Sequence, residues 1–234
     1  MRGLDIFFNY AILCGLVRET GWCNKEDTMP NWCENVVYVC GTKEARDKIR
    51  DIFQGDKPFT TIVPEPDYNK VVVPFTYPQI HVGETAVAGR RDAWWDWRVQ
   101  NWGTKWDLDV DEVQIDENDS LLNHEALSFG FQTAWSCPAN ILQKMSEIEG
   151  VELVHGTFSE PGCDFVGFIT FSEGEKELEV IHSHQDYLEL GNVIREDVKK
   201  GEVDPVILQL HEIVETNFEG CFEMCHDEEE EEEE

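Results

Sequence analysis

The feature that most constrains this fold is a short strand followed at once by a capped amphipathic helix. Residues 33–40 (CENVVYVC) are rich in valine and end at Gly41, a composition typical of a strand. Thr42 follows as a helix cap, and apolar residues then recur at helical spacing until Gly55. These apolar residues are Ala45, Ile49, Ile52 and Phe53. A helix with one apolar face needs a partner layer, so this unit predicts a sheet with helices packed on it.

A second strand–helix unit follows in the middle of the chain. Residues 126–135 alternate large apolar side chains with small or polar ones, which predicts a half-buried strand. Pro138 suits a first helical position, and the apolar face after it continues to Gly150. Between the two units, a less regular strand pattern lies at 109–116 and a turn is predicted at 118–123. A short helix is also predicted at 90–100.

Strand and helix patterns continue after residue 150. Strands over 151–159 and 164–171 flank a Pro-Gly turn, which indicates a tight hairpin, and 176–184 is a further predicted strand. Helices are predicted from Tyr187 to Gly201 and from Asp204 onward. Together these elements predict an α+β sandwich, in which an antiparallel or mixed sheet is covered on one face by helices.

The net charge of −31 belongs almost entirely to the second half of the chain. Residues 1–28 and 29–107 each carry −1, whereas residues 108–226 carry −21 and the tail 227–234 adds −8. Glu173, Glu175, Glu177 and Glu179 alternate and are expected to line one face of a strand.

This composition excludes several classes of protein. Apolar residues at 41% and aromatic residues at 11% exclude a wholly disordered acidic chain. No apolar run is long enough to span a membrane. Long-range repulsion argues against direct binding of a nucleic-acid backbone.

The two ends of the chain differ from the part between them. Residues 1–28 are interpreted as a peripheral extension, which an upstream start codon would produce, because Met29 is a second candidate start and is the first residue of the first motif described below. The alternative is an amphipathic helix docked on the domain or on a membrane surface. Residues 227–234 are all acidic and are expected to form a disordered tail. That tail serves either solubility alone or the binding of a basic partner.

The cysteines and histidines predict neither a disulfide framework nor a metal site. Eight cysteines show no framework spacing, and no credible signal peptide precedes them, so reduced thiols in a cytosolic protein are expected. Cys221, Cys225 and His226 have no second Cys or His pair at a zinc-like spacing. His182 and His184 are interpreted as part of a polar strand face. No metal and no cofactor are expected.

Five of the eight tryptophans lie between residues 94 and 106. So many indoles cannot all be exposed without forming a large apolar patch. One interpretation is an aromatic subcore, in which basic side chains pack over the indoles and pair with neighbouring aspartates. The other is a site whose flat aromatic surfaces hold a base or a peptide. The residues of the subcore interpretation are Arg91, Arg98 and Lys105 with Asp92, Asp96 and Asp107.

Three motifs occur in one order along the chain. They are 29–35 (MPNWCEN), 101–107 (NWGTKWD) and 131–138 (FQTAWSCP), and Glu160 with Phe165-x-Gly167 continues the order. Together they resemble the YubB-type ferredoxin-like family carried by bacteriophages and plasmids, whose function is unknown. The likeness covers about residues 29–174, and Cys137 stands where a second proline is usual in that family.

The resemblance implies a ferredoxin-like βαββαβ core and a phage or plasmid origin, and it supplies no reaction. Residues 29–185 are then a ferredoxin-like domain with a tryptophan-rich insertion at about 56–107. Residues 186–226 are expected to form a C-terminal helical segment. The acidic tail and the first 28 residues lie outside the likeness.

The favoured function is that of a non-catalytic accessory protein of a phage or other mobile element, acting in the host cytoplasm. Its carboxylates would imitate a nucleic-acid backbone and occupy the basic groove of a host protein, such as a defence nuclease. In the competing interpretation, the acidity serves only solubility.

The alternative function is a small enzyme or nucleotide-binding protein with its site at the tryptophan-rich segment. Lys105 would hold a phosphate, Asp107 would act as general base or metal ligand, and Glu160 would be the paired acid. The candidate ligand or interaction residues are Asn101, Trp102, Lys105, Trp106, Asp107, Trp135 and Glu160.

No catalytic residue is assigned, because the sequence contains no phosphate loop, nucleophile elbow or His-x-x-x-His pair. A third interpretation uses the sheet as an RNA platform. It ranks last because the phenylalanines of 126–172 have only Lys144 as a basic neighbour in the sequence.

Overall fold

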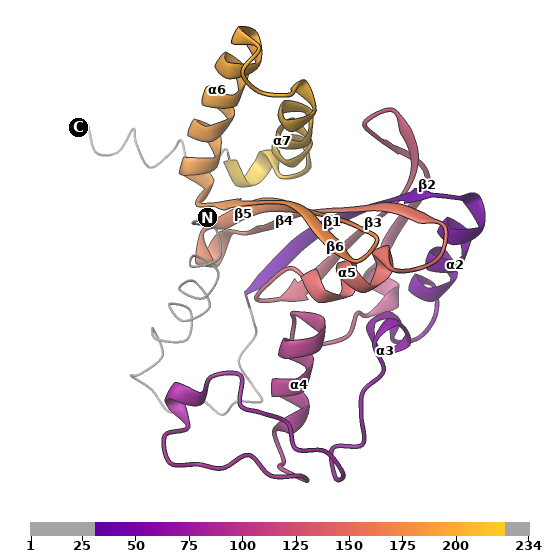
Figure 1. Ribbon diagram of the computed structural model, residues 1–234, viewed down its shortest axis with the longest axis vertical. Helices are drawn as coiled ribbons and strands as arrows, with labels where there is room; N and C mark the ends of the chain where they lie inside the picture. Colours follow the sequence, from indigo (N-terminus) through magenta and orange to yellow (C-terminus); the bar gives the residue numbers. More distant parts are fainter. Residues whose placement is uncertain (1–30, 223–234) are drawn as a thin grey trace.

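One six-stranded sheet with helices on both faces forms the centre of the protein (Figure 1). The computed structural model describes residues 31–222. The strands run in the order β2-β3-β1-β4-β5-β6, and every neighbouring pair is antiparallel. Their bounds are β1 Trp32–Gly41, β2 Gln114–Leu121, β3 His124–Ala134, β4 Val151–Glu160, β5 Phe165–Ser172 and β6 Glu175–His182. The helices are α2 Lys43–Phe53, α3 Pro58–Ile62, α4 Ala93–Trp102, α5 Ala139–Ser146, α6 His184–Lys200 and α7 Pro205–Asn217. Short 3-10 turns lie at Pro78–Ile80, Val110–Glu112 and Pro161–Cys163.

Four of the strands and two of the helices form a βαββαβ core. In chain order the core is β1, α2, β2, β3, α5 and β4, and in the sheet β1 lies between β3 and β4 with β2 outside β3. This is the strand order of a ferredoxin-like α+β sandwich. The hairpin of β5 and β6 extends the sheet beyond β4. The expected fold class, with a tryptophan-rich insertion and C-terminal helices, is confirmed.

The central strand β1 is buried on both faces because its middle is almost entirely apolar. Val37 and Val39 belong to the core under α2 and α5, whereas Tyr38 and Cys40 belong to a second core on the opposite face. A strand with neighbours on both edges and helices on both sides is expected to be a continuous apolar run, as 36–40 (VVYVC) is.

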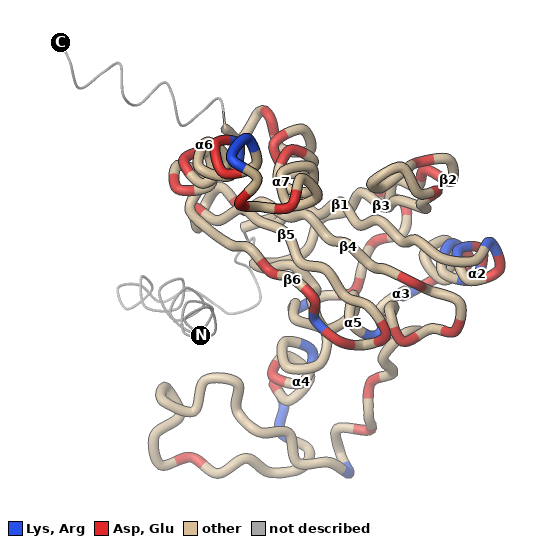
Figure 2. Tube along the Cα trace, turned by 45° about the horizontal axis from the view of Figure 1, so that its top comes forward, with Lys and Arg blue, Asp and Glu red and all other residues tan. Residues whose placement is uncertain are grey.

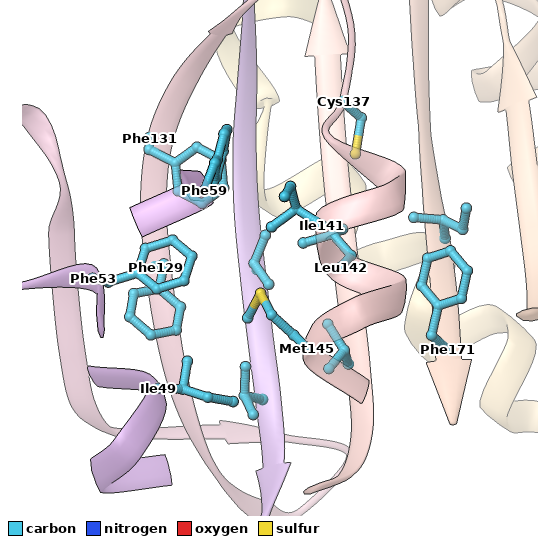
Figure 3. Close-up of a cluster of buried hydrophobic side chains, with 14 of the residues drawn as sticks. Ile49, Phe53, Phe59, Phe129, Phe131, Cys137, Ile141, Leu142, Met145 and Phe171 are labelled. Atoms are coloured by element: carbon cyan, nitrogen blue, oxygen red, sulfur yellow. The ribbon is translucent and has the colours of Figure 1, made fainter. Parts of the chain in front are cut away.

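Helices α2 and α5 cover the first face of the sheet (Figure 3). Helix α2 begins where the Oγ1 atom of Thr42 accepts a hydrogen bond from the amide of Ala45, at 3.2 Å, as predicted. Its Phe53 stacks on Phe129 of β3, with ring centroids 4.3 Å apart. Helix α5 buries Ile141, Leu142 and Met145.

Helices α6 and α7 cover part of the second face, so the prediction of a sheet covered on one face only is wrong. Helix α7 begins at the predicted Asp204, which accepts from the amide of Val206. Helix α6 begins earlier than predicted, because Ser183 caps it by accepting from the amide of Asp186, so His184 is helical and does not belong to a strand face. The apolar side chains of both helices pack on Phe168 of β5. The helix pattern shows that a face is buried, but it does not show which side of the sheet receives it. The packing residues are Tyr187, Leu210, Val214 and Phe218.

Strand β2 differs most from its prediction. The predicted strand at 109–116 is replaced by a 3-10 turn at Val110–Glu112 and a strand from Gln114 to Leu121, so the predicted turn at 118–123 is largely strand. Only Leu122 and Asn123 turn, both with positive φ. Because β2 is a polar edge strand with a register shift after Asp116, it shows no regular alternation.

Two other local expectations are changed by the structure. Glu173 does not continue the row of glutamates along β6, because it has a φ of 50° and lies in the turn before that strand. The expectation of reduced thiols is met at Cys33, Cys40 and Cys137 and is wrong at Cys163, which is disulfide-bonded. Cysteine spacing in a sequence does not reveal such pairing.

The predicted extension at 1–28 and the tail at 227–234 lie outside the described residues, and the proposed division into domains stays a prediction. Within residues 31–222, no helix combines the length and apolar composition needed to cross a membrane.

Three histidines are buried between the sheet and the α6–α7 pair. They are His155 on β4, His184 at the start of α6 and His211 on α7. The Nδ1 atom of His155 lies 2.9 Å from the Oγ1 atom of Thr170, and its Nε2 atom meets no partner. Burial lowers the pKa of His155 to about 3. Burial also lowers the pKa of His211, against the opposing charge of Glu215.

Acidification is therefore expected to destabilise the fold from about pH 6.5 downward. Unfolded histidines take up a proton near that pH, whereas native His155 and His211 do not, so the unfolded state binds more protons and is favoured as the pH falls. Each histidine adds up to about 1.4 kcal/mol per pH unit to this loss.

Urea unfolding at about pH 7 and about pH 5 measures the effect. His155→Gln should lose less stability between the two pH values than the unchanged protein, because glutamine does not titrate. His124→Gln is the matched control at an exposed position. Equal losses in all three proteins would contradict the assignment.

Candidate functional site

Side chains of the first and third sequence motifs meet at the end of the sheet where β1 begins and β3 ends. Asn35 of β1 is buried there. Its Nδ2 atom donates to the carbonyl of Cys33 at 2.8 Å, to the Oγ1 atom of Thr133 at 2.8 Å and to the carbonyl of Phe131 at 3.3 Å. One amide therefore ties the first motif to the third.

The middle motif joins the same network through backbone carbonyls. Ser136 Oγ donates to the carbonyl of Gly103 at 2.6 Å, and Thr104 Oγ1 donates to the carbonyl of Ala134 at 3.0 Å. Thr133 Oγ1 closes the loop by donating to the carbonyl of Ser136 at 2.8 Å. Gly103 ends α4 with a φ of 87°, which favours glycine at this position. The segments that follow α4 and β3 are therefore fixed against each other.

Glu160 is buried at the end of β4, where it is only 1% exposed. Its Oε1 atom accepts from the amide of Gly162 at 3.0 Å, and its Oε2 atom meets no hydrogen-bond donor within the described part of the chain. Burial raises the pKa of Glu160, while the backbones of Cys163 and Gly162 and the side chain of Asn31 oppose the rise.

The negative charge of Glu160 acts on the thiol of Cys33. Burial, with the neighbouring Cys137 and Glu160, raises the pKa of the Cys33 thiol well above its ordinary value. A thiol in this state is not a nucleophile at neutral pH.

Trp102 is a core residue and does not offer its indole face to a ligand. It is fully buried, and its Nε1 atom donates to the carbonyl of Val63 at 3.0 Å. Phe59 and Trp97 meet its ring edge to face, at centroid distances of 6.1 and 5.8 Å. Its neighbour Asn101 donates to the carbonyl of Trp97 within α4, at 2.8 Å.

Lys105 and Trp106 form the more accessible part of the predicted site. The Nζ atom of Lys105 lies 4.4 Å from the centroid of the Trp106 ring, a cation–π distance. Trp106 in turn contacts Trp32, which is 40% exposed, with ring centroids 6.0 Å apart. Trp135 lies beyond the end of β3, where its amide donates to the carbonyl of Asn31 at 3.0 Å.

Asp107 caps the short helix α3. Its carboxylate accepts from the amides of Phe59 at 2.8 Å and Thr60 at 3.0 Å, from the hydroxyl of Thr60 at 2.8 Å and from the amide of Leu108 at 3.0 Å. Four donors occupy both oxygens, so Asp107 has little capacity left to act as a base or as a metal ligand.

The other tryptophans support the aromatic-subcore interpretation, with different ion pairs from those expected. The guanidinium of Arg98 lies 5.1 Å from the Trp94 ring centroid and pairs with Glu65. Arg90, which the prediction did not include, pairs with Asp92 at 2.7 Å and with the buried Asp96. The insertion is therefore held on α4 by its own charges and rings.

Sequence reasoning missed the residues that organise this end of the sheet. Asn35 and Thr133 belong to the recognised motifs but were not chosen, because 98 positions separate them and nothing local shows that they bond. Ser136 and Thr104 were missed for the same reason, since each bonds a backbone carbonyl of a distant segment.

A Ser–His–Asp hydrogen-bond chain was also missed. Ser159 Oγ lies 2.9 Å from His184 Nε2, and His184 Nδ1 lies 2.9 Å from Asp164 Oδ1. This order of contacts is that of a catalytic triad. Ser159, however, is 0% exposed and pairs on both edges inside the sheet. We therefore interpret the chain as structural hydrogen bonds, in which the buried Ser159 and His184 and the exposed Asp164 join β4, the turn before β5 and α6.

The polar groups at the end of the sheet where β1 begins form a structural hydrogen-bond network. Its amide, hydroxyl and carboxylate groups are used to join β1, β3, α3 and the end of α4. At the edge of this network, a ligand would contact the Trp32–Trp106 pair and Lys105. The described residues contain no group of three or more His, Cys, Asp or Glu side chains placed to hold a metal ion.

The fold defines an α+β sandwich of the ferredoxin-like class, and the comparison with protein families agrees. Residues 102–195 match the family described as a ferredoxin-like domain in Api92-like protein. The matched segment runs from the end of α4 into α6 and includes Gly103, Thr133, Ser136 and Glu160.

Among solved structures, the chain is similar to the crystal structure of a protein api92 from Yersinia pseudotuberculosis. The two share 9% sequence identity with a TM-score of 0.44, over 66% of this chain and 99% of the other. No curated protein matches the chain. The family match over residues 102–195 confirms the ferredoxin-like part of the expected relationship, and the YubB-type relationship and the phage or plasmid origin stay predictions.

Asp107→Ala is expected to lower the free energy of unfolding by about 1–3 kcal/mol, because it removes the cap of α3 and leaves amide donors without an acceptor. Chemical denaturation measures this loss. Asp109→Ala, which removes a local turn cap nearby, is the control and should cost less. A thermal-shift series with nucleotides should show no ligand effect that depends on Asp107, and such an effect would restore the enzyme interpretation.

Glu160→Gln is expected to raise stability at neutral pH and to leave it nearly unchanged in acid. The raised pKa of Glu160 means that its native form is favoured below about pH 4.5 and loses stability as the pH rises through the native pKa. Glutamine keeps an oxygen for the amide of Gly162 without a buried charge. Thermal unfolding at both pH values gives the comparison, and a loss of stability at neutral pH would show that the carboxylate is paired.

Proposed function

We propose that the protein acts by binding a basic protein of a host cell through its carboxylate-rich half, as a mimic of a nucleic-acid backbone. The proposal includes the cytoplasm of the host as the place of action. It also includes a YubB-type accessory role in a phage or other mobile element, directed against host defence. The proposal rests on one observation, which is that basic side chains compensate only a small part of the negative charge of residues 108–222.

Residues 108–222 contain 25 acidic and five basic residues. Every one of those five basic side chains already pairs with an acidic neighbour of the same half. They are Lys144, Lys176, Arg195, Lys199 and Lys200. The local ion pairs therefore neutralise only a small part of the charge, and a strongly negative field remains outside the fold.

The acidic residues of this half gather in three parts of the fold (Figure 2). One group is on the α6–α7 pair and the residues that directly follow α7, and it includes the exposed Glu189, Glu212 and Glu219. A second lies at the end of the sheet where α5 ends and the β5–β6 turn begins. A third follows the edge strand β2. A basic groove would meet carboxylates fixed on a rigid sandwich, which lowers the entropic cost of binding.

The alternative functions have less support in the geometry. The enzyme or nucleotide-binding interpretation needs a free Asp107, whose oxygens already accept four hydrogen bonds. The RNA-platform interpretation needs exposed rings on the sheet, whereas Phe129, Phe131, Phe168 and Phe171 are buried.

The protein is expected to displace a short DNA duplex from a basic host nucleic-acid-binding protein. Fluorescence anisotropy of a labelled duplex, over a panel of purified host nucleases and DNA-binding proteins, measures the displacement. It should weaken strongly between about 50 mM and about 200 mM salt, because the contacts are electrostatic.

The triple change Glu189→Gln, Glu212→Gln and Glu219→Gln should weaken this displacement by about tenfold, at about 0.5 kcal/mol for each exposed charge. The matched control removes three exposed acids from the neutral half, as Glu44→Gln, Asp56→Asn and Glu84→Gln. Absence of displacement across the panel, or an equal effect of both triple variants, would refute the proposal.

A further inference from the structure

The irregular insertion before α4 exposes a set of aliphatic side chains. We call residues 67–90 the arm. Its Val82 is 86% exposed and its Ile80 is 66% exposed, and Val72 and Val87 are each more than half exposed. These four aliphatic side chains all belong to one 24-residue segment and are available for contact with another molecule.

The arm is held in shape although it contains no helix or strand apart from one short 3-10 turn. The amide of Gly89 donates to the carbonyl of Tyr68 at 2.7 Å and so closes its base. Arg90 lies over the Phe75 ring at 4.3 Å and pairs with the buried Asp96, and Phe75 stacks on His81 with centroids 4.0 Å apart. A surface that is already ordered loses little conformational entropy when it binds.

The arm also differs in charge from the rest of the molecule. Its four charged residues are Asp67, Lys70, Glu84 and Arg90, which sum to zero in a chain of net charge −31. Figure 1 shows the arm and α4 on one side of the sheet, with the acidic pair α6–α7 on the other side. The exposed apolar side chains therefore lie away from the acidic helices.

We propose that the arm is a self-association surface, on which a second copy of this chain docks arm to arm. A twofold contact of this kind pairs each arm with the same surface of the partner. It joins the molecules at a neutral segment and keeps their acidic helices apart, and salt largely screens the repulsion between charges separated by more than about 10 Å. A contact through α6, α7 or the edge strand β2 would instead bring like charges together.

Sedimentation velocity of the full chain, from about 1 to about 100 μM, tests this proposal. A concentration-dependent dimer is expected. The double change Ile80→Asp and Val82→Asp should leave only monomer, with an unchanged circular-dichroism spectrum, because both side chains are exposed. Val193→Asp is the matched control, since Val193 is 55% exposed on α6, far from the arm, and its variant should still dimerise.

A second measurement identifies which surfaces touch. Val82→Cys should yield an intermolecular 82–82 disulfide on mild oxidation by glutathione disulfide, detected by peptide mass spectrometry, and Val193→Cys should not. Monomer at every concentration, a dimer that survives the arm substitutions, or the absence of the 82–82 peptide would overturn the proposal. The result is separate from duplex displacement, because a strictly monomeric protein that still displaces the duplex refutes only the dimer.

Discussion

The double-sided burial of β1 is the constraint on which the rest of the structure depends. This strand pairs with β3 on one edge and with β4 on the other, and its side chains enter two separate cores. Because β3 and β4, which follow β1 by many residues, pair with its two edges, the tryptophan-rich insertion must lie outside the sheet. Its Asn35 then fixes the end of β3, and through Thr133 and Ser136 it fixes the segment after α4. The motifs recognised in the sequence therefore consist largely of residues that hold β3 and the segment after α4 against β1.

Elements with a local signal were predictable from the sequence, and those set by distant partners were not. Thr42 caps α2 and Pro161-Gly162 turns the β4–β5 hairpin, because caps and turns depend on neighbouring residues. The start of β2 was misplaced because a polar edge strand owes its existence to β3. For the candidate site, the high tryptophan content correctly identified residues 94–106 as an unusual segment. It did not show that Trp102 is buried or that Asp107 caps α3, since both depend on residues about 40 or more positions away.

The acidic excess, the structural network and the exposed apolar side chains thus lie in different parts of the protein. The ordered polar network around Asn35 and the aromatic subcore around α4 stabilise the fold, and neither needs a ligand to explain its residues. The excess of carboxylates lies on the α6–α7 pair, the β2 edge and the end of the sheet beside α5, whereas the arm is neutral and apolar. Such a division suits a protein that acts by contact. Its acidic face would meet a basic partner, while its arm would meet a second copy.

Hydrogen–deuterium exchange can show whether the protein binds its partner through the acidic residues of α6, α7 and β2. The protein is compared alone and in complex with a basic protein from which it displaces duplex DNA. We predict slower exchange in α6 and α7 and at the edge strand β2, with no change in residues 101–107. Slower exchange confined to residues 101–107 and Trp135 would contradict it, because the tryptophan-rich segment would then be the binding site.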